Sequence, residues 1–386
     1  MTATPARRKP IIVVGGGVGG LASGLALAQH GYPSIVFESR HTSAYVDRGD
    51  ILHAGVLPLL AAWAVDGDLA AQAPVRFHRF RIADETGQIL LDADTTALLG
   101  ADRYFTAIRH QNLIQALRAA AVRTGLVDLR DGERCTSLVH DGRRVCGVDT
   151  TVGRYEADLT VVATGARSHL PTACFGQAQI HHYGTAFYNA CVQAIDGYTD
   201  CGYYVLGRYG AMVLAPLPNG HQRVGVQIKA SELDHVAGQD FLRRAVAARF
   251  QPLAGTALRL LDRPRIYRLQ RATRSTWWVS GAVLVGDVAH QVHPVGGQGM
   301  NLALFDAEAL SHSLAAGSGE PDDIDAAACR YGQHRRQQVR RALRRTHLLG
   351  LAADRPFTTG RLVLVRLLNV TTSAKRAVLR SMIDVR

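Results

Sequence analysis

The sequence predicts an α/β protein in which a parallel-sheet domain, assembled from separate stretches of chain, carries an inserted antiparallel sheet and is followed by helices. Three observations predict this class. Short β-branched apolar runs at 10–14 and 159–163 are typical of buried parallel strands. Alternating, aromatic-rich segments between 183 and 229 are typical of an antiparallel sheet. Residues beyond 323 combine helical spacing with a basic excess.

The composition is that of a folded globular chain. Of its 386 residues, 47% are hydrophobic and 20% charged, which excludes a disordered or collagen-like protein. The six cysteines are scattered, without a CxxC pair or a His/Cys cluster, so neither a metal site nor a disulfide framework is expected. We identify no signal peptide and no run of about 18 apolar residues, and a cytoplasmic location is expected.

The chain opens with a βαβ unit. The run 10–14 is predicted to form the first strand, 21–30 a helix rich in small residues, and 34–37 the second strand. A glycine-rich turn joins the first strand to the helix. This order predicts a Rossmann-like domain.

The turn matches the GxGxxG pattern, with Gly15, Gly17 and Gly20 in the three glycine positions and Val18 between them. These glycines serve a tight turn, close approach of the backbone to a pyrophosphate, and close packing of helix on strand. The helix N-terminus offers N–H groups to phosphates. Glu38 ends the second strand, where a carboxylate accepts hydrogen bonds from ribose hydroxyls and disfavours a 2′-phosphate. We therefore expect a dinucleotide here.

The elements that follow are predicted from periodicity. Helices are expected over 109–124, 299–314, 323–349 and 361–382. Strands are expected over 133–140, 145–150, 154–156, 159–163, 183–194, 201–208, 211–217, 222–229 and 283–285.

A second motif follows the strand 283–285. This strand ends in Gly-Asp, which projects the Asp287 carboxylate from the ligand-facing edge of an α/β sheet. The glycines of the stretch 294–301 allow the chain to pass close to a flat ligand before a helix begins. The candidate cofactor-binding residues of this motif are Asp287, Pro294, Gly297, Gly299, Met300 and Asn301.

With both motifs in place, the sequence resembles the para-hydroxybenzoate hydroxylase-like FAD monooxygenases, which include the ubiquinone-biosynthesis hydroxylases. The resemblance covers residues 10 to about 320. It implies that Asp287 binds the ribityl chain of FAD and that 294–301 lies against the isoalloxazine ring. It also implies that Arg109, which opens an Arg-x-x-x-Leu helix start, contacts FAD. Thr164 stands where the family has an aspartate associated with FAD and pyridine nucleotide.

Other candidates lie between these motifs. Arg40 is a candidate cofactor-binding residue. Arg48 is a candidate contact of the flavin ring or its phosphates, for which a role unrelated to FAD is an equal explanation. His53 is a candidate acid/base facing the substrate, because the usual pKa of histidine lies near operating pH, or else a packed helix residue. The candidate pocket-lining residues of the antiparallel sheet, for which ordinary sheet packing is an equal explanation, are Tyr188, Tyr203 and Met212.

The order of the predicted elements suggests a discontinuous domain organisation. The FAD-binding domain is expected to comprise 1–75, 100–180 and 275–320. The substrate-binding sheet domain is expected to comprise 76–99 and 181–274, and 321–386 to form basic C-terminal helices.

The family implies an FAD-dependent monooxygenase that uses NAD(P)H and O₂ to hydroxylate an aromatic or quinone-like small molecule through a flavin C4a-hydroperoxide. The chain lacks a second GxGxxG, which fits NAD(P)H as a transient reductant. The alternatives are a halogenase, reductase or oxidase of the same fold, or a non-catalytic flavoprotein. Trp277-Trp278 does not form the WxWxIP motif of tryptophan-type halogenases.

The net charge of +12 is concentrated in residues 330–386, which contain 14 Lys and Arg and two acidic residues. Arg340, Arg341, Arg344 and Arg345 belong to this excess. They are interpreted as a solvated helix face packed on the body, or as a surface for acidic lipid or an acidic carrier protein. Nucleic acid is not expected as a partner, because no recognised nucleic-acid fold is present.

Overall fold

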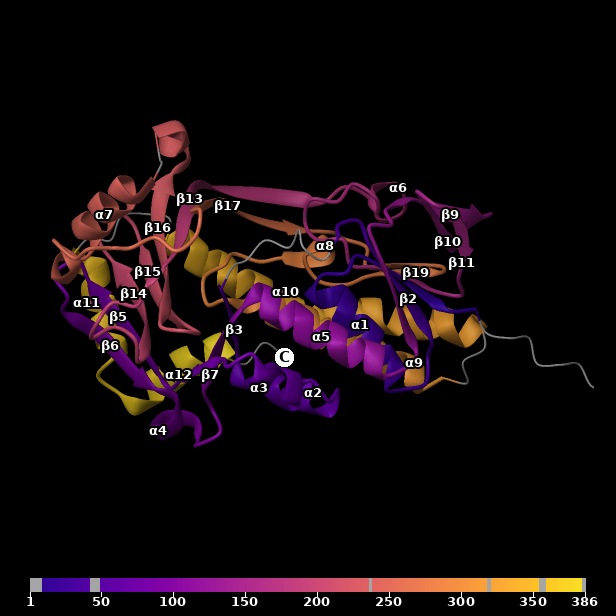
Figure 1. The fold of residues 1–386 in the computed structure, drawn as a ribbon, viewed down its shortest axis with the longest axis horizontal. Coiled ribbons are helices and arrows are strands. Elements are labelled where there is room, and N and C mark those ends of the chain that lie inside the picture. Colours follow the sequence, from indigo (N-terminus) through magenta and orange to yellow (C-terminus); the bar gives the residue numbers. More distant parts are fainter. Residues whose placement is uncertain (1–8, 42–48, 236–237, 318–320, 354–358, 384–386) are drawn as a thin grey trace, which may run out of the picture.

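The computed structural model describes residues 9–41, 49–235, 238–317, 321–353 and 359–383. Figure 1 shows an elongated molecule with a mainly parallel sheet towards one end and a larger, mainly antiparallel sheet towards the other. The two sheets and the C-terminal helices confirm the predicted fold class. The long strand β13 (Gln179–Gln193) and the long helix α10 (Pro321–Ala353) run between the two ends.

The six-stranded sheet has the order β18–β19–β12–β1–β2–β8, and all its pairs are parallel except β18–β19. Its strands are β1 (Ile11–Val14), β2 (Ser34–Glu38), β8 (Val127–Asp131), β12 (Thr160–Val162), β18 (Trp278–Val279) and β19 (Ala282–Leu284). Three helices pack together on it: α1 (Val18–Ala28), α5 (His110–Arg123) and α9 (Gln298–Ala315). All but one residue of α1 are buried, because this helix lies between the sheet and its two neighbours.

The opposite face of the parallel sheet is covered by a small antiparallel sheet. Val148 of this sheet, and Ala157 directly after its last strand, pack on Ile12 and Val14. Its strands are β9 (Cys135–Asp141), β10 (Arg144–Thr150) and β11 (Arg154–Glu156). The strands predicted over 133–156 are thereby confirmed.

The seven-stranded sheet has the order β17–β13–β16–β15–β14–β5–β6. Its other strands are β5 (Arg79–Asp84), β6 (Ile89–Asp94), β14 (Cys201–Leu206), β15 (Met212–Leu217), β16 (His221–Lys229) and β17 (Arg265–Thr273). One face is covered by α7 (Gly238–Arg249), a helix that the sequence analysis did not predict. Since side chains alternate along a strand, neighbouring residues face either α7 or the opposite side.

A three-stranded sheet of β3 (Gly49–Leu52), β7 (Phe105–Arg109) and β4 (Val75–Phe77) joins the two large sheets. Phe77 and Phe105 on this sheet stack and share an apolar cluster with Cys191 and Leu217 of the seven-stranded sheet. The remaining short helices are η2 (Ala54–Val56), α2 (Leu57–Ala62), α3 (Asp66–Ala71), α4 (Thr95–Leu99), α6 (Thr172–Phe175), η3 (Ala230–His235), η4 (Gln251–Leu253) and α8 (Asp287–His290).

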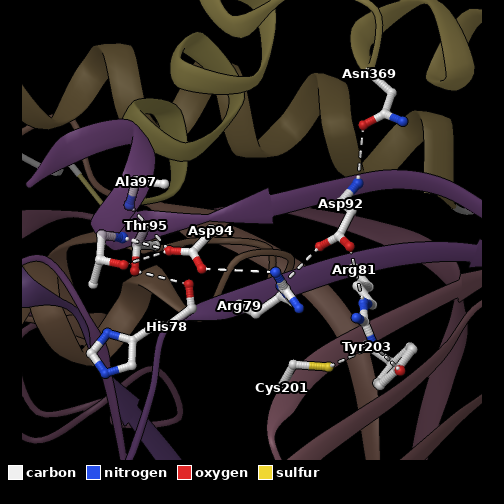
Figure 2. Close-up of polar contacts among 11 residues, drawn as sticks. His78, Arg79, Arg81, Asp92, Asp94, Thr95, Ala97, Cys201, Tyr203 and Asn369 are labelled. Carbon is white, nitrogen blue, oxygen red and sulfur yellow. Dashed lines mark hydrogen bonds and ion pairs between the residues drawn. The ribbon is translucent and has the colours of Figure 1, made fainter.

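The last helices are docked on the body. The predicted helix 361–382 is two helices, α11 (Thr359–Leu368) and α12 (Thr372–Ile383). The turn between them is tied to the sheet edge, because the Asp92 backbone N–H donates to Asn369 Oδ1 over 3.1 Å. Figure 2 shows the same Asp92 side chain held by Arg79 and Arg81 of the neighbouring strand. These contacts show that α11 and α12 pack on the body of the protein.

Candidate cofactor and substrate site

The first glycine turn uses its glycines for two different purposes. A Cβ on Gly15, whose φ is +111°, would lie 2.5 Å from the Ala163 carbonyl oxygen, and a Cβ on Gly20 would lie 1.8 Å from the Gly15 oxygen. Both glycines are therefore required for the chain to fold this way. A Cβ on Gly17, at the N-terminus of α1, would meet no atom of the described residues within 4 Å. Gly17 thus borders open space at the positive end of a helix.

A buried polar atom lies next to this turn. Thr164 follows β12 and contacts the turn beside Gly15. Its hydroxyl oxygen is buried and has no hydrogen-bond partner in the described part of the chain. Buried polar groups are normally hydrogen-bonded, so an unpaired one beside this turn fits a missing polar ligand.

Glu38 is fixed at the end of β2, directly beside the turn. It is 5% exposed, and its Oε2 accepts a hydrogen bond from the Gly16 N–H over 3.1 Å. Its Oε1 accepts from the backbone N–H and the Nε of Arg40 over 3.0 and 3.1 Å. Arg40 therefore holds the Glu38 carboxylate in place. This carboxylate lies where the ribose of a dinucleotide is expected.

The second turn follows β19. Gly286 has a φ of +75°, and Asp287 begins the single turn of helix α8. A Cβ on Gly299 would lie 3.5 Å from Asp287 Oδ1, so this carboxylate lies against the start of α9. The Gly-Asp turn and the N-terminus of α9 are thus next to one another.

Asn301 holds the two sides of the site together. Its Oδ1 accepts from the His53 N–H over 3.0 Å, and its Nδ2 donates to the carbonyl oxygens of Ile51 and Gly297 over 3.0 and 2.9 Å. Gly297, with a φ of +62°, precedes α9 and lies close to the His53 ring. Asn301 therefore fixes the end of β3 against the 294–301 loop through its side chain.

His53 is 1% exposed and lies edge-on to Phe105, with ring centroids 5.8 Å apart. Burial lowers the pKa of His53 to about 4; a hydrogen bond to the Gly296 backbone opposes this shift, and the nearby charge of Arg345 adds to it. The expectation of a pKa near operating pH is therefore wrong. The neutral ring keeps Nδ1, which is buried and without a hydrogen-bond partner among the described residues, as an acceptor.

The other predicted cofactor residues have varied surroundings. Arg109 Nη2 lies 2.7 Å from His221 Nδ1 and thereby links β7 to the seven-stranded sheet. Val18 is buried in the core of the parallel-sheet domain, and Met300 packs on the same core. The Pro294 carbonyl accepts a hydrogen bond from the Gly297 N–H over 2.9 Å, which closes the loop. Arg48 lies outside the described residues.

The predicted pocket residues lie on the face of the seven-stranded sheet that α7 covers. Tyr188, Tyr203 and Met212 belong to the apolar cluster under α7, and the Tyr188 hydroxyl donates to the Gly238 carbonyl over 3.1 Å. This placement does not fit a pocket facing His53; it is the sheet packing that the sequence analysis held equally open. The neighbouring Tyr204 points to the opposite face, where burial raises the pKa of its hydroxyl.

Two further residues lie next to this site. Arg345 of α10, assigned to the basic excess, donates from Nη2 to Gln298 Oε1 over 3.2 Å. His293 is 1% exposed, lies edge-on to Tyr183, and its Nδ1 accepts from the Val295 N–H over 3.1 Å. No local sequence signal separates Arg345 from the surrounding arginines.

Comparison with known proteins identifies the family. The family described as FAD binding domain matches residues 8–346. The chain is 25% identical over 328 residues to a 3-hydroxybenzoate 6-hydroxylase of Klebsiella oxytoca, covering 80% of each chain. It is 25% identical over 374 residues to the phenazine 1,6-dicarboxylic acid hydroxylase PhzS of Lysobacter antibioticus, covering 86% of this chain and 88% of that protein.

Two solved structures share the fold. PqsL of P. aeruginosa, in complex with 2-aminobenzoylacetate, has a TM-score of 0.82 at 18% identity, covering 93% of this chain and 99% of PqsL. The p-nitrophenol 4-monooxygenase PnpA of Pseudomonas putida DLL-E4 has a TM-score of 0.81 at 19% identity, covering 96% of each chain. With the family match over residues 8–346, these likenesses lead to one conclusion: the chain belongs to the FAD binding domain family, among the para-hydroxybenzoate hydroxylase-like flavoproteins.

Proposed function

We propose that the protein is an FAD-dependent monooxygenase that uses NAD(P)H and O₂ to hydroxylate an aromatic or quinone-like small molecule. The observation that carries this proposal is the open space at Gly17, at the N-terminus of α1, next to Gly16, whose N–H binds the Glu38 carboxylate. The names of the two relatives above, a hydroxybenzoate hydroxylase and a phenazine dicarboxylic acid hydroxylase, support an aromatic substrate.

The chain provides a group for each part of FAD. The α1 N-terminus at Gly17 would bind the pyrophosphate, and Glu38 the ribose. Asp287 would bind the ribityl chain, and the 294–301 loop would flank the isoalloxazine ring. Bound FAD supplies the redox and oxygen-activating chemistry, while the protein supplies orientation and a dry, polar-lined pocket.

His53 is the residue best placed to orient a substrate beside this loop. It is neutral at neutral pH, and its buried Nδ1 is an acceptor for a substrate hydroxyl. Asn301 holds its backbone and the Gly296 backbone holds its ring. A hydrogen bond from a substrate hydroxyl to Nδ1 would hold that substrate against the loop. It would also polarise the O–H bond of the hydroxyl.

The test is a flavin and product assay. The purified protein is mixed with NADH or NADPH, in air, with and without hydroxybenzoates, hydroxyquinolones and quinols. We expect bound FAD, slow reductant oxidation alone, and acceleration by a true substrate with ¹⁸O from ¹⁸O₂ in the product. Fast, substrate-independent oxidation with stoichiometric peroxide would instead indicate an oxidase. Absence of any FAD uptake would refute the flavoprotein assignment.

We also propose that the C-terminal helices bring the protein to an anionic membrane surface. Of the fourteen large hydrophobic side chains that are exposed in the described residues, seven lie within 348–370, including Leu348 at 66% and Leu367 at 58%. Among the exposed arginines of α10 are Arg336, Arg340, Arg341 and Arg344. Apolar side chains beside arginines suit an interfacial contact. None of the helices in the described part of the chain is long and apolar enough to cross a bilayer.

This proposal is tested by sedimentation with anionic and neutral vesicles. We expect the wild type to bind anionic vesicles at low salt and to dissociate at high salt, where the Debye length falls from ~10 Å at 0.1 M to ~3 Å at 1 M. Changing Arg340, Arg341 and Arg344 to Gln should abolish binding, with Arg345 kept because it contacts Gln298. A matched control changes three exposed arginines in or next to the small antiparallel sheet, Arg134, Arg143 and Arg154, to Gln. Equal binding by both variants would refute the assigned surface.

A further inference from the structure

A buried ion cluster lies behind the Gly-Asp turn, where three helices meet. Asp306 of α9 and His290 of α8 are fully buried, and Arg335 of α10 is 3% exposed. Asp306 Oδ2 accepts from His290 Nε2 over 2.5 Å and from the Gly286 N–H over 2.9 Å. Asp306 Oδ1 accepts from Arg335 Nε over 2.6 Å, and Arg335 Nη2 donates to the Leu302 carbonyl.

The Asp306 carboxylate is ionised in this setting. Burial alone would raise the pKa of Asp306, but the charges and hydrogen bonds of His290 and Arg335 outweigh it and lower the pKa to about 2. A buried carboxylate and guanidinium each depend on the other, because an uncompensated buried charge is strongly unfavourable. Removing the Arg335 charge would therefore force Asp306 and its partners to rearrange.

The partners of Asp306 bracket the residue predicted to bind the ribityl chain. Gly286 immediately precedes Asp287, and His290 ends the same helical turn. The His290 ring also stacks on Trp277, with centroids 4.9 Å apart, which fixes its position further. The carboxylate of Asp306 thus holds both ends of the turn that carries Asp287.

Helix α10 also contacts the 294–301 stretch, which is predicted to flank the isoalloxazine ring. Arg345, ten residues after Arg335, donates to Gln298 at the first residue of α9. Ten helical residues span about 15 Å, so one helix supports both loops from behind. The family match, which ends at residue 346, includes both of these arginines.

We propose that α10 supports FAD binding, because Arg335 acts as a positioning residue. Arg335 holds Asp287 in place through Asp306 and His290. The inference rests on the proposed FAD site. FAD binding and docking of α10 on α9 then stabilise one another, because a coupling between two binding events acts equally in both directions.

The experiment compares four variants of the full chain as apoprotein, titrated with FAD by flavin fluorescence at a temperature where circular dichroism shows each to be folded. R335M removes the charge and R335K keeps it but loses the planar fork. R336M is the matched control, because Arg336 is the next residue and is exposed. L343A loosens the packing of α10 without touching the ion cluster.

We expect R335M to weaken FAD binding roughly ten- to a hundredfold, the effect of losing about one charged hydrogen bond that positions Asp287. R335K should lie between R335M and wild type, and R336M should be near wild type. L343A should lose less affinity than R335M, because it loosens α10 but leaves the ion cluster intact. We also expect FAD to slow amide exchange in α10 of the wild type, a readout that remains available if R335M does not fold. FAD binding by R335M equal to that of wild type, an equal loss in L343A, or exchange in α10 unaffected by FAD would each overturn the inference. Wild-type protein that takes up no FAD would instead overturn the proposed function.

Discussion

The first glycine turn has two roles, binding the FAD pyrophosphate at Gly17 and packing α1 against β1 at Gly20. Single Gly→Ala substitutions can separate them. Gly17 has φ −77° and ψ −176°, which alanine adopts without strain. Its Cβ would meet no described atom within 4 Å, so Gly17→Ala introduces no clash into the apoprotein. Loss of a favourable N-cap residue and the lower entropy of the unfolded chain each change stability by about 0.5–1 kcal/mol in opposite directions. The free energy of unfolding should therefore stay within about 1 kcal/mol of wild type.

The same methyl group should weaken FAD binding. It occupies the space at the α1 N-terminus where the pyrophosphate is expected, and moves the phosphate oxygens away from the backbone N–H groups. Each hydrogen bond to a charged acceptor contributes about 1.5–3 kcal/mol. Loss of one such bond corresponds to roughly ten- to a hundredfold weaker binding.

Gly20→Ala should instead lower the stability of the apoprotein. Its Cβ would lie 1.8 Å from the Gly15 oxygen and 3.0 Å from the Gly15 carbonyl carbon, both backbone atoms that cannot rotate aside. Helix α1 must then move away from β1, and such overpacking costs typically about 1–3 kcal/mol. Gly19→Ala is the control, since its Cβ would make ordinary 3.5 Å contacts with Ala303 and Val285.

Thermal unfolding of the apoproteins and FAD titration of each variant are the two measurements. Gly17→Ala should lose affinity and keep its stability, Gly20→Ala should lose stability, and Gly19→Ala should change little. Unchanged FAD affinity in Gly17→Ala would refute the placement of the pyrophosphate. Wild-type stability in Gly20→Ala would refute the assigned packing of α1 on the turn.

Two further predictions concern the second turn and pH. Asp287→Ala should weaken FAD binding roughly ten- to a hundredfold by removing a hydrogen bond to the ribityl chain, as measured by fluorescence titration; an unchanged dissociation constant would exclude Asp287 from the site. Burial lowers the pKa of both His53 and His293 to about 4, so the unfolded chain binds protons that the folded protein rejects. The free energy of unfolding should therefore fall as the pH falls from about 6.5 to about 4. The slope should be smaller in His53→Phe, and a slope equal to wild type would contradict the buried, neutral state of His53.

Local chemistry determined much of this protein. The Gly15–Gly20 turn, Glu38 at the end of a strand and the Gly-Asp turn at Asp287 were recognisable because turns and strand ends depend on neighbouring residues. Four strands of the antiparallel sheet, β13, β14, β15 and β16, followed from alternation in the same way, whereas β5, β6 and β17 were not predicted. These features also carried the family assignment.

Only the tertiary structure decided which face of that sheet is turned to the site. Alternation places Tyr203 and Tyr204 on opposite faces, but it does not say that α7 covers the face of Tyr203. Charge along α10 was equally uninformative: Arg335 is buried against Asp306 while its neighbour Arg336 is exposed. The physical reason is the same in both cases. Burial, and with it the pKa of His53 and the pairing of Arg335, depends on contacts between residues far apart in the chain, whereas sequence patterns report the preferences of residues close together.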